Sequence, residues 1–345
     1  MKTIVVTGGS GFIASWVIRE LLIHGYKVRT SINDISKKDE IGAAIMTLQP
    51  TALSKNLSFF EVNSSNPNNW NETMTGADGI ICIASEYGRG SEPNKATINA
   101  AKDKILAVLQ AAANNHIKRV ILTSSQAAVT PSASVGHKTI DEDFWPDVKN
   151  PETNSQSIVQ VTIEKAAWQF AKDNQLQLTT ILPGTVLGPI LSPDHLGDNK
   201  ILLELLNNDR RMIPKAPLAI NDVRDLAVLH QLVLEKDTAI GHRILAADQK
   251  MTLAEIAQIY QKQYARLNLK FTYLPDWVTV LGAKFSPFLR QFTPLLKQKN
   301  YQYKTEFAQK QLGWQSHPIN KTLINAADLL IFNKLVKNVP EKTYR

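Results

Sequence analysis

The sequence predicts an α/β protein in which helices cover both faces of a parallel sheet and a smaller, mainly helical region follows. Three observations carry this prediction. Short β-branched runs alternate with longer amphipathic stretches from Lys2 to about Gly188. A glycine-rich turn directly follows the first of these runs, and beyond Gly188 prolines and helical periodicity replace the regular alternation. Strands that alternate with helices form parallel βαβ units, which build a doubly wound sheet of the Rossmann type.

Six β-branched runs are the candidate strands. They lie at 3–7, 27–31, 57–62, 79–84, 119–124 and 178–182. A seventh run, from Gly241 to Ala246, has the composition of a buried strand, so we expect the stretch from Ile220 to Ala247 to return to the sheet. The predicted division is therefore a first domain of residues 1–188 plus about 220–247, and a second domain of about 189–219 plus 248–345.

Two of the predicted helices have clear boundaries. The first follows the glycine-rich turn, with Ile13, Val17 and Leu21 on one face. It ends near Gly25, because glycine suits the left-handed conformation at a helix C-terminus. In the second domain a helix begins near 252–255, where a threonine and a glutamate have the spacing of a capping box.

Composition bounds the class of protein. The chain has 345 residues, 43% of them hydrophobic, which is enough for two globular domains. Its single cysteine, Cys82, lies in an apolar run, and no apolar leader precedes the first predicted strand, so we expect an inert core thiol and a cytoplasmic location. No window has the roughly 20 uninterrupted apolar residues that cross a bilayer, so we expect no membrane span.

Charge and histidine content argue against two further classes of site. The formal net charge is +8, but the basic residues are scattered, and no regular array of aromatics accompanies the densest late cluster, around Lys297, Lys299 and Lys304. We therefore expect no nucleic-acid partner. The seven histidines are dispersed and no Cys/His cluster has ligand spacing, so no metal site is predicted.

The glycine-rich turn is the strongest functional signal. It follows a predicted strand and opens a predicted helix, which is the setting of a dinucleotide-binding turn, and residues 5–14 read Val-Val-Thr-Gly-Gly-Ser-Gly-Phe-Ile-Ala. Gly8 permits the tight turn, Gly11 lets the backbone approach a pyrophosphate, and Ala14 packs the helix on the strand. The diphosphate would then lie on free N–H groups at the positive end of the helix.

The end of the second predicted strand bears on the choice between NAD and NADP. An acidic residue there would bind the ribose 2′-hydroxyl of NAD, but this chain has Ser31, Ile32 and Asn33. Lys37 or Lys38 can reach a 2′-phosphate, although two lysines in a charged run also suit a solvated loop. NADP is therefore the preferred expectation, with NAD as the alternative.

Several motifs together resemble the extended short-chain dehydrogenase/reductases of the NAD-dependent epimerase/dehydratase type, and within them the dihydroflavonol reductase, cinnamoyl-CoA reductase and aldehyde reductase group. The resemblance covers nearly the whole chain. The motifs lie at 7–16, at 76–79 leading to 83–85, and at 118–125, 164–168, 182–189 and 222–225. Each is weak alone and the set is specific.

The resemblance implies a cofactor bound along the carboxyl ends of the strands. Contacts are implied at the glycine turn, beside the adenine at Asn63 and Ser64, beside the ribose, and beside the nicotinamide. Asn63 departs from the family, which usually has aspartate there, but an amide can still bond an adenine. The full set of expected cofactor residues is Gly8, Ser10, Gly11, Phe12, Ile13, Asn33, Lys37, Asn63, Ser64, Ala84, Ser85, Ser124, Pro183, Thr185 and Val186.

The family's catalytic serine is present and its tyrosine and lysine are not. The resemblance assigns the serine to Ser125, with Ser124 beside it. Counting back from Glu164 in the motif at 164–168, the tyrosine position falls on Gln156 and the lysine position on Gln160. Residues four apart share a helix face, so both glutamines are expected to face the cofactor.

Glutamine can orient a carbonyl but cannot act as a general acid, a function typically worth about 10²–10⁴-fold in rate. No tyrosine occurs between Tyr87 and Tyr260, so no small insertion restores the pair. Tyr87, just after the fourth predicted strand, and His195, in the loop that shapes the substrate pocket of relatives, are the other candidate acids. Loop packing and a solvated loop are the plainer explanations of these two residues.

The sequence therefore predicts an NAD(P)-dependent oxidoreductase that reduces a small ketone or aldehyde, or oxidises the alcohol, with an atypical active site of Ser125, Gln156 and Gln160. The alternative is a non-catalytic NAD(P)-binding sensor or regulatory protein on the same fold. A nucleotide-sugar epimerase or dehydratase is a weaker third possibility, since such enzymes also use the tyrosine. We expect a monomer or a homodimer.

Overall fold

The computed structural model describes residues 1–47, 51–62, 69–83, 94–132, 139–297, 301–337 and 339–340. In this part of the chain, seven parallel strands form the main sheet in the order β11-β7-β5-β4-β1-β2-β3. The strands are β1 (Thr3–Val6), β2 (Lys27–Ile32), β3 (Leu57–Glu61), β4 (Gly79–Ile83), β5 (Arg119–Thr123), β7 (Gln177–Leu182) and β11 (Arg243–Leu245). The predicted doubly wound α/β fold and all seven predicted strands are confirmed.

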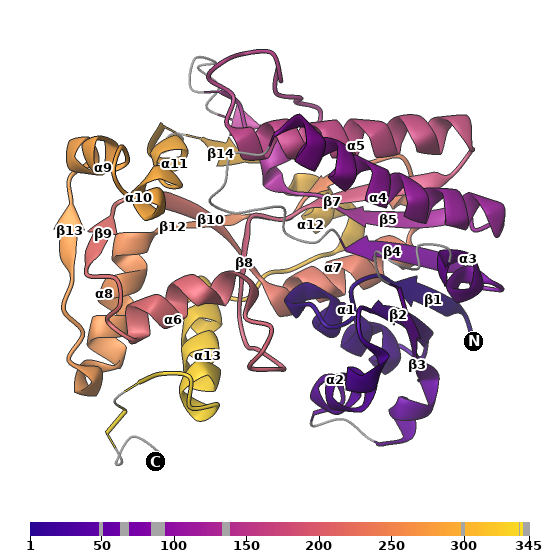
Figure 1. The fold of residues 1–345 in the computed structure, drawn as a ribbon, viewed down its shortest axis with the longest axis horizontal. Coiled ribbons are helices and arrows are strands. Elements are labelled where there is room, and N and C mark those ends of the chain that lie inside the picture. The colour runs from indigo at the N-terminus through magenta and orange to yellow at the C-terminus, as the bar shows by residue number, and fades with distance from the viewer. Residues whose placement is uncertain are drawn as a thin grey trace.

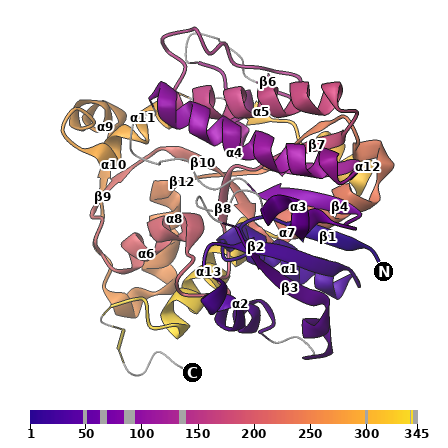
Figure 2. The same ribbon diagram turned by 45° about the vertical axis from the view of Figure 1, so that its right-hand side comes forward.

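Helices cover both faces of this sheet (Figures 1 and 2). One face carries α1 (Phe12–Ile23), α2 (Lys38–Ile45) and α7 (Val223–Glu235), and the other carries α3 (Asn69–Met74), α4 (Lys95–Asn114) and α5 (Ser155–Asp173). Successive side chains of a strand therefore face opposite layers of helices. In β1, Ile4 and Val6 join the core under α1, whereas Val5 joins the core under α4. A strand buried on both faces has this pattern of continuous apolar residues.

The first helix forms as its sequence predicts. Val17 and Leu21 are fully buried and Ile13 packs beside them. The helix ends at His24, and Gly25 follows with a φ of +79°. A residue with a side chain is strained at that angle, which is why glycine ends the helix there.

The C-terminal part is mainly helical, with small sheets. Its helices are α6 (Lys200–Leu206), α8 (Leu253–Gln263), α9 (Asp276–Gly282), α10 (Pro287–Arg290), α11 (Thr293–Lys297), α12 (Glu306–Leu312) and α13 (Ile319–Phe332). The capping box predicted for α8 is present, because Thr252 and Glu255 bond each other's backbone N–H. Figure 1 shows that strands of the main sheet point toward these C-terminal elements.

Three small sheets join distant segments. β10 (Pro217–Asp222) pairs in parallel with β8 (Thr185–Leu187) and antiparallel with β12 (Gln249–Thr252). β9 (Met212–Pro214) pairs with β13 (Thr272–Leu274), and β6 (Thr139–Ile140) pairs with β14 (Gln302–Tyr303). Short 3-10 helices complete the order: η1 (Ile35–Lys37), η2 (Thr51–Asn56), η3 (Gln126–Val129), η4 (Gly197–Asn199), η5 (Asp237–Ala239) and η6 (Ala265–Leu267).

The predicted return of the chain to the main sheet begins later than Ile220. Ile220 lies in β10, which belongs to a small sheet, so only α7 and β11 return. This small sheet also joins strands from both sides of the predicted domain boundaries, since β8 precedes residue 188 and β12 follows residue 247. One core cluster likewise runs from α1 to α13. The division into two domains stays a prediction.

Two expectations from composition concern Cys82 and the membrane. Cys82 is fully buried, and burial raises the pKa of its thiol to about 12, so the predicted inert thiol is confirmed. Among the described residues, none of the helices has the length and apolar character that a bilayer crossing requires.

Candidate active site

The glycine-rich turn between β1 and α1 has the geometry of a phosphate cradle. Gly8 has a φ of +69°, its N–H donates to Ser31 Oγ (3.0 Å), and the Gly11 N–H closes the turn on the Gly8 carbonyl (2.8 Å). A Cβ on Gly9 would lie 2.2 Å from Thr30 Oγ1, so only glycine lets the turn lie against β2. Ala14 is buried, as predicted for the residue that packs α1 on the sheet.

The start of α1 fits an anionic ligand. Its N-cap residue is Gly11, which has no side chain to cap the helix, so the N–H groups of Phe12 and Ile13 have no capping partner among the described residues. These groups stand at the positive end of a 12-residue helix. The turn and the open N–H groups together fit the diphosphate of NAD or NADP.

The end of β2 carries few charged groups. Asn33 is exposed, and Asp34 bonds locally, because its carboxylate accepts from the Ser36 N–H (3.0 Å) and hydroxyl (2.6 Å). These hydrogen bonds hold the pKa of Asp34 below its usual value. Lys37 is exposed at the end of η1, so this end of β2 offers a cation to a phosphate.

Three buried polar side chains hold the segment after β7, where the nicotinamide contacts are predicted. Asn221 accepts from the Gly184 N–H (2.8 Å), Asp198 from the Val186 N–H (2.8 Å) and Asn199 from the Gly188 N–H (3.2 Å). The side chains of all three are nearly inaccessible to solvent. The segment that includes Pro183 and Thr185 is thus fixed by hydrogen bonds at alternate residues.

Glu164 ties α5 to β7, to β11 and to the residue that follows β5. It is fully buried and accepts from Ser124 Oγ (2.6 Å), Thr180 Oγ1 (2.8 Å) and Arg243 Nε (2.8 Å). Arg243 also lies over the ring of Trp145, 3.5 Å from its centroid. The hydroxyl of Ser124, predicted to contact the cofactor, is therefore engaged with Glu164, and this network fixes the position of α5.

Ser125 stands at the carboxyl end of β5, where it caps η3. Its Oγ accepts from the Ala127 N–H (3.2 Å), and the residue is half-buried. On α5, Gln156 is exposed in the first turn and Gln160 is half-buried one turn later. Because the strands are parallel, Ser125, the glycine turn and the segment after β7 meet at one edge of the sheet. The roles of these residues stay predictions.

Several predicted residues cannot be placed. Asn63, Ser64, Ala84, Ser85 and Tyr87 lie outside the described residues.

His195 lies at the glycine turn. It lines a small hollow with Gly9, Ser10 and Ile41, and burial lowers the pKa of its imidazole. The surrounding loop packs on α1, since Trp16 Nε1 donates to the Pro189 carbonyl (2.8 Å). This position is beside the expected diphosphate site, so it does not support His195 as the acid for a substrate carbonyl.

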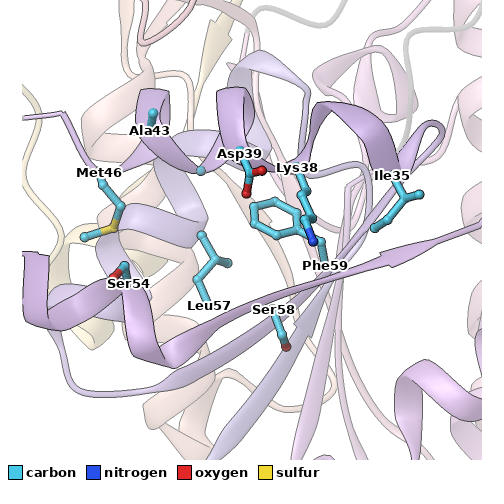
Figure 3. Close-up of a pocket in the computed structure, with 10 residues that line it drawn as sticks. Ile35, Lys38, Asp39, Ala43, Met46, Ser54, Leu57, Ser58 and Phe59 are labelled. Atoms are coloured by element: carbon cyan, nitrogen blue, oxygen red, sulfur yellow. The ribbon is translucent and has the colours of Figure 1, made fainter.

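A larger hollow than the one beside His195 lies elsewhere on the described surface. It has a volume of about 600 Å³ under α2 at the edge strand β3, with Lys38, Asp39 and Phe59 in its wall (Figure 3). It holds none of the predicted catalytic residues. A pocket normally marks an active site. The candidate active site of this protein is nevertheless at the carboxyl ends of the strands, because the glycine turn and Ser125 lie there.

Two aspartates and a histidine form a cluster near α7, and their side chains bond one another or neighbouring residues. Ligand atoms of Asp222, Asp225 and His317 lie within 4.8 Å of one another. Asp222 forms an ion pair with Arg224 (2.6 Å) and accepts from Thr322 (2.8 Å), while Asp225 bonds His317. These hydrogen bonds explain the cluster without a metal ion.

Two residues near Ser125 were missed from the sequence. Gln126 Oε1 lies 2.8 Å from where a Cβ on Gly184 would be, and the Tyr303 hydroxyl lies 3.1 Å from Thr130 Oγ1. The alternation at 301–303, Tyr-Gln-Tyr, could have indicated a strand. Nothing local to the sequence indicated its partner, which is β6.

Comparison with known proteins identifies the family. Residues 4–244 match the model of the NAD dependent epimerase/dehydratase family. A cinnamoyl-CoA reductase from Medicago truncatula is 30% identical over 274 residues, which cover 78% of this chain and 82% of the relative. A noscapine synthase from Papaver somniferum is 29% identical over 289 residues, covering 80% and 82% of the two chains.

Solved structures share the fold. The yeast methylglyoxal/isovaleraldehyde reductase complexed with NADPH superposes with a TM-score of 0.75 at 20% identity, covering 97% of this chain and all of the other. Vestitone reductase from alfalfa gives 0.72 at 21%, with the same coverage. The resemblance found in the sequence is confirmed: the chain belongs to the NAD dependent epimerase/dehydratase family, among the extended short-chain dehydrogenase/reductases.

Proposed function

We propose that this protein is an NADPH-dependent reductase of a small aldehyde or ketone. The observation that carries the proposal is the meeting of three elements at one edge of the sheet: the open N–H groups at the start of α1, Ser125 after β5, and the segment fixed after β7. Relatives named for the reduction of carbonyl compounds support the same activity.

The roles of the residues follow from their chemistry. The cofactor, when bound, supplies a hydride to the carbonyl carbon. The N–H groups of Phe12 and Ile13 would bind its diphosphate, and Pro183, Thr185 and Val186 would bind its nicotinamide end. The Ser125 hydroxyl would donate a hydrogen bond to the substrate carbonyl and so orient it.

Gln156 and Gln160 would act through hydrogen bonds alone. An amide can bond a ribose hydroxyl or a carbonyl, but it does not titrate near neutral pH. Preference for NADPH over NADH would come from Lys37, since Asn33 directly follows β2 and the next residue, Asp34, has its carboxylate bonded to Ser36. The oligomeric state, a monomer or a homodimer, belongs to the same proposal.

The second candidate function is a non-catalytic NADP(H)-binding protein. The observation that favours it is the loss of both ionisable residues at once on α5, at Gln156 and Gln160. Such a protein would bind the cofactor as a sensor or as a structural ligand and would turn over no carbonyl compound.

Binding and turnover distinguish the two functions. Purified protein is titrated with NADPH and NADH by cofactor fluorescence, and NADPH oxidation is then followed with a panel of small aldehydes and ketones that includes isovaleraldehyde. The wild type is compared with the Gln156→Tyr/Gln160→Lys double variant, and a Ser125→Ala variant serves as the control for carbonyl orientation.

If the protein is a reductase, wild-type turnover should be well above background. Ser125→Ala should then lower kcat by about 10²-fold or more and leave the NADPH affinity unchanged. Tight NADPH binding without wild-type turnover, and activity that appears only in the double variant, would instead assign the non-catalytic function. Absence of binding to either nucleotide contradicts both.

A further inference from the structure

The proposed reduction needs a proton for the carbonyl oxygen, and a tyrosine hydroxyl is the family's means of supplying it. Six tyrosines lie in the described part of the chain. Four of them bond groups remote from Ser125: Tyr26 bonds Glu235, Tyr260 and Tyr264 bond α13, and Tyr273 bonds Gln261. Of the six described tyrosines, Tyr301 and Tyr303 alone reach the segment that follows Ser125.

These two tyrosines differ in what they contact. The Tyr301 hydroxyl donates to the Ser132 carbonyl (3.2 Å), seven residues beyond Ser125. The Tyr303 hydroxyl lies 3.1 Å from Thr130 Oγ1, and the Thr130 hydroxyl donates to the carbonyl of Gln126 (2.9 Å), the residue next to Ser125. Tyr303 is therefore the described tyrosine whose hydroxyl is linked, through Thr130, to the residue beside the predicted catalytic serine.

Strand pairing fixes Tyr303 in this place. β14 runs parallel to β6 with Tyr303 opposite Ile140, and the Lys304 N–H donates to the Ile140 carbonyl (2.9 Å). The ring packs on a small core cluster that includes Ala128 and Val129 of η3. The phenol is thus held by backbone hydrogen bonds on one side and by packing on the other.

Gln126 connects Tyr303 to the predicted nicotinamide segment. Its N–H donates to the Pro183 carbonyl (2.8 Å), and its side-chain oxygen lies against Gly184. The hydroxyl of Tyr303 therefore lies beside a residue that contacts both Ser125 and the segment after β7.

We propose that Tyr303 is the proton donor for the carbonyl oxygen, an inference that rests on the proposed reductase function. Addition of the hydride at the carbonyl carbon moves the C=O π electrons onto oxygen. The Oη–H bond of Tyr303 breaks and its proton bonds to that oxygen, which gives the alcohol. The phenolate then takes a proton from water, so the residue is ready for the next turnover.

The neighbours of Tyr303 suit both halves of this cycle. The Thr130 hydroxyl donates to the Gln126 carbonyl (2.9 Å), so before the transfer Tyr303 donates toward Thr130. After the transfer, the Thr130 hydroxyl and the Gln126 amide can donate to the phenolate oxygen. No lysine is needed for this arrangement, in keeping with Gln160 at the family's lysine position.

Burial raises the pKa of Tyr303, and the neighbouring side chains of Thr130 and Gln126, which can donate to the phenolate, act on this pKa in the opposite direction. The ionisable group that acts on it is Tyr301, and Lys250 Nζ donates to the Tyr301 carbonyl (3.1 Å). Asp141 and Glu142 directly follow β6. The phenol is accordingly protonated at neutral pH, which suits reduction. Oxidation of the alcohol requires the phenolate and should accelerate as the pH rises.

The test compares Tyr303→Phe with the matched control Tyr301→Phe, which removes the same atom from the residue just before β14. In Tyr303→Phe we expect kcat for isovaleraldehyde reduction to fall about 10²-fold or more, with NADPH Kd and the thermal midpoint near wild type. Tyr301→Phe should keep the wild-type kcat. Alcohol oxidation by the wild type should rise about tenfold per pH unit between about pH 7 and 9, and this slope should vanish in Tyr303→Phe.

A second measurement does not depend on turnover. With uniform ¹³C labelling, each tyrosine ¹³Cζ resonance is assigned through the backbone spins of its own residue, so identifying Tyr303 requires no variant. In the wild type with NADP⁺ bound, the Tyr303 resonance should shift when isovaleramide, an unreactive carbonyl analogue, is added. A resonance that stays in place overturns the inference, even if the Tyr303→Phe variant fails to fold.

The outcomes separate this inference from the proposed function. Wild-type turnover that Tyr303→Phe retains in full overturns the inference and leaves the reductase function standing. A wild-type protein that binds NADPH but reduces no carbonyl compound overturns both.

Discussion

At the residue scale, Gly184 is a position near the candidate active site where only glycine fits. A Cβ there would lie 2.3 Å from the Ala219 carbonyl oxygen of β10 and 2.8 Å from Gln126 Oε1. The carbonyl belongs to a paired strand and cannot move aside without breaking the small sheet. The close approach therefore requires glycine in the segment predicted to hold the nicotinamide.

Gly184→Ala should therefore lower the free energy of unfolding by about 1–3 kcal/mol, as overpacking does, and weaken NADPH binding. Urea unfolding and cofactor fluorescence measure the two effects. Gly42→Ala is the matched control, because its Cβ would meet the Phe59 ring at an ordinary 3.6 Å inside α2. That variant should be neutral or more stable by up to about 1 kcal/mol. Equal stability of both variants would contradict the steric explanation.

At the scale of elements, the buried ion pair of Glu164 and Arg243 sets how α5 meets the sheet. The pair joins α5 to β11, and Glu164 also accepts from Ser124, just after β5, and from Thr180 of β7. Both side chains are buried, so each charge depends on the other for its stabilisation. The position of Gln156 and Gln160 relative to Ser125 follows from this network, since all three lie on the elements that it joins.

Arg243→Met should therefore destabilise the protein by about 3–5 kcal/mol, because it leaves the Glu164 carboxylate buried without its counter-charge. Chemical unfolding measures the loss. The control is Lys310→Met, which removes an exposed i,i+4 partner of Glu306 on α12 and should leave the unfolding midpoint nearly unchanged. If the unfolding midpoint of Arg243→Met were as high as that of Lys310→Met, the buried ion pair would contribute nothing to the stability of the protein.

For the whole molecule, one buried histidine couples stability to pH. His230 of α7 is fully buried; its Nδ1 lies 2.7 Å from the Leu226 carbonyl, so Nδ1 carries the proton, and Nε2 accepts from the Thr123 hydroxyl of β5 (2.7 Å). Burial lowers the pKa of His230 to about 4. The folded protein therefore holds this imidazole neutral, between α7 and β5.

The sign of the pH effect follows by linkage. Between about pH 4 and the unfolded pKa near 6.5, the unfolded chain binds a proton at His230 that the folded chain does not. The contribution of neutral His230 to the free energy of unfolding is complete above about pH 6.5. It falls by about 3 kcal/mol as the pH is lowered toward 4.

Urea unfolding of the wild type and of His230→Gln at pH 4 to 7 measures this contribution. The stability difference between them should shrink as the pH falls. His116→Asn, at an exposed turn with φ of 58°, controls for loss of a histidine as such. A difference between wild type and His230→Gln that is constant over the range would rule out this coupling.

Local patterns in the sequence determined the parallel strands, the boundaries of α1, the capping box of α8 and the glycine turn, because turn chemistry, helix periodicity and β-branched runs act between residues close in the chain. The family motifs likewise predict Ser125 as the catalytic serine, with Gln156 and Gln160 at the tyrosine and lysine positions. Only the tertiary structure paired β14 with β6, which brings Tyr303 to Thr130 across 173 residues, and paired Arg243 with Glu164 across 79. Such contacts depend on how distant elements pack, and that packing leaves no periodic signal at either end.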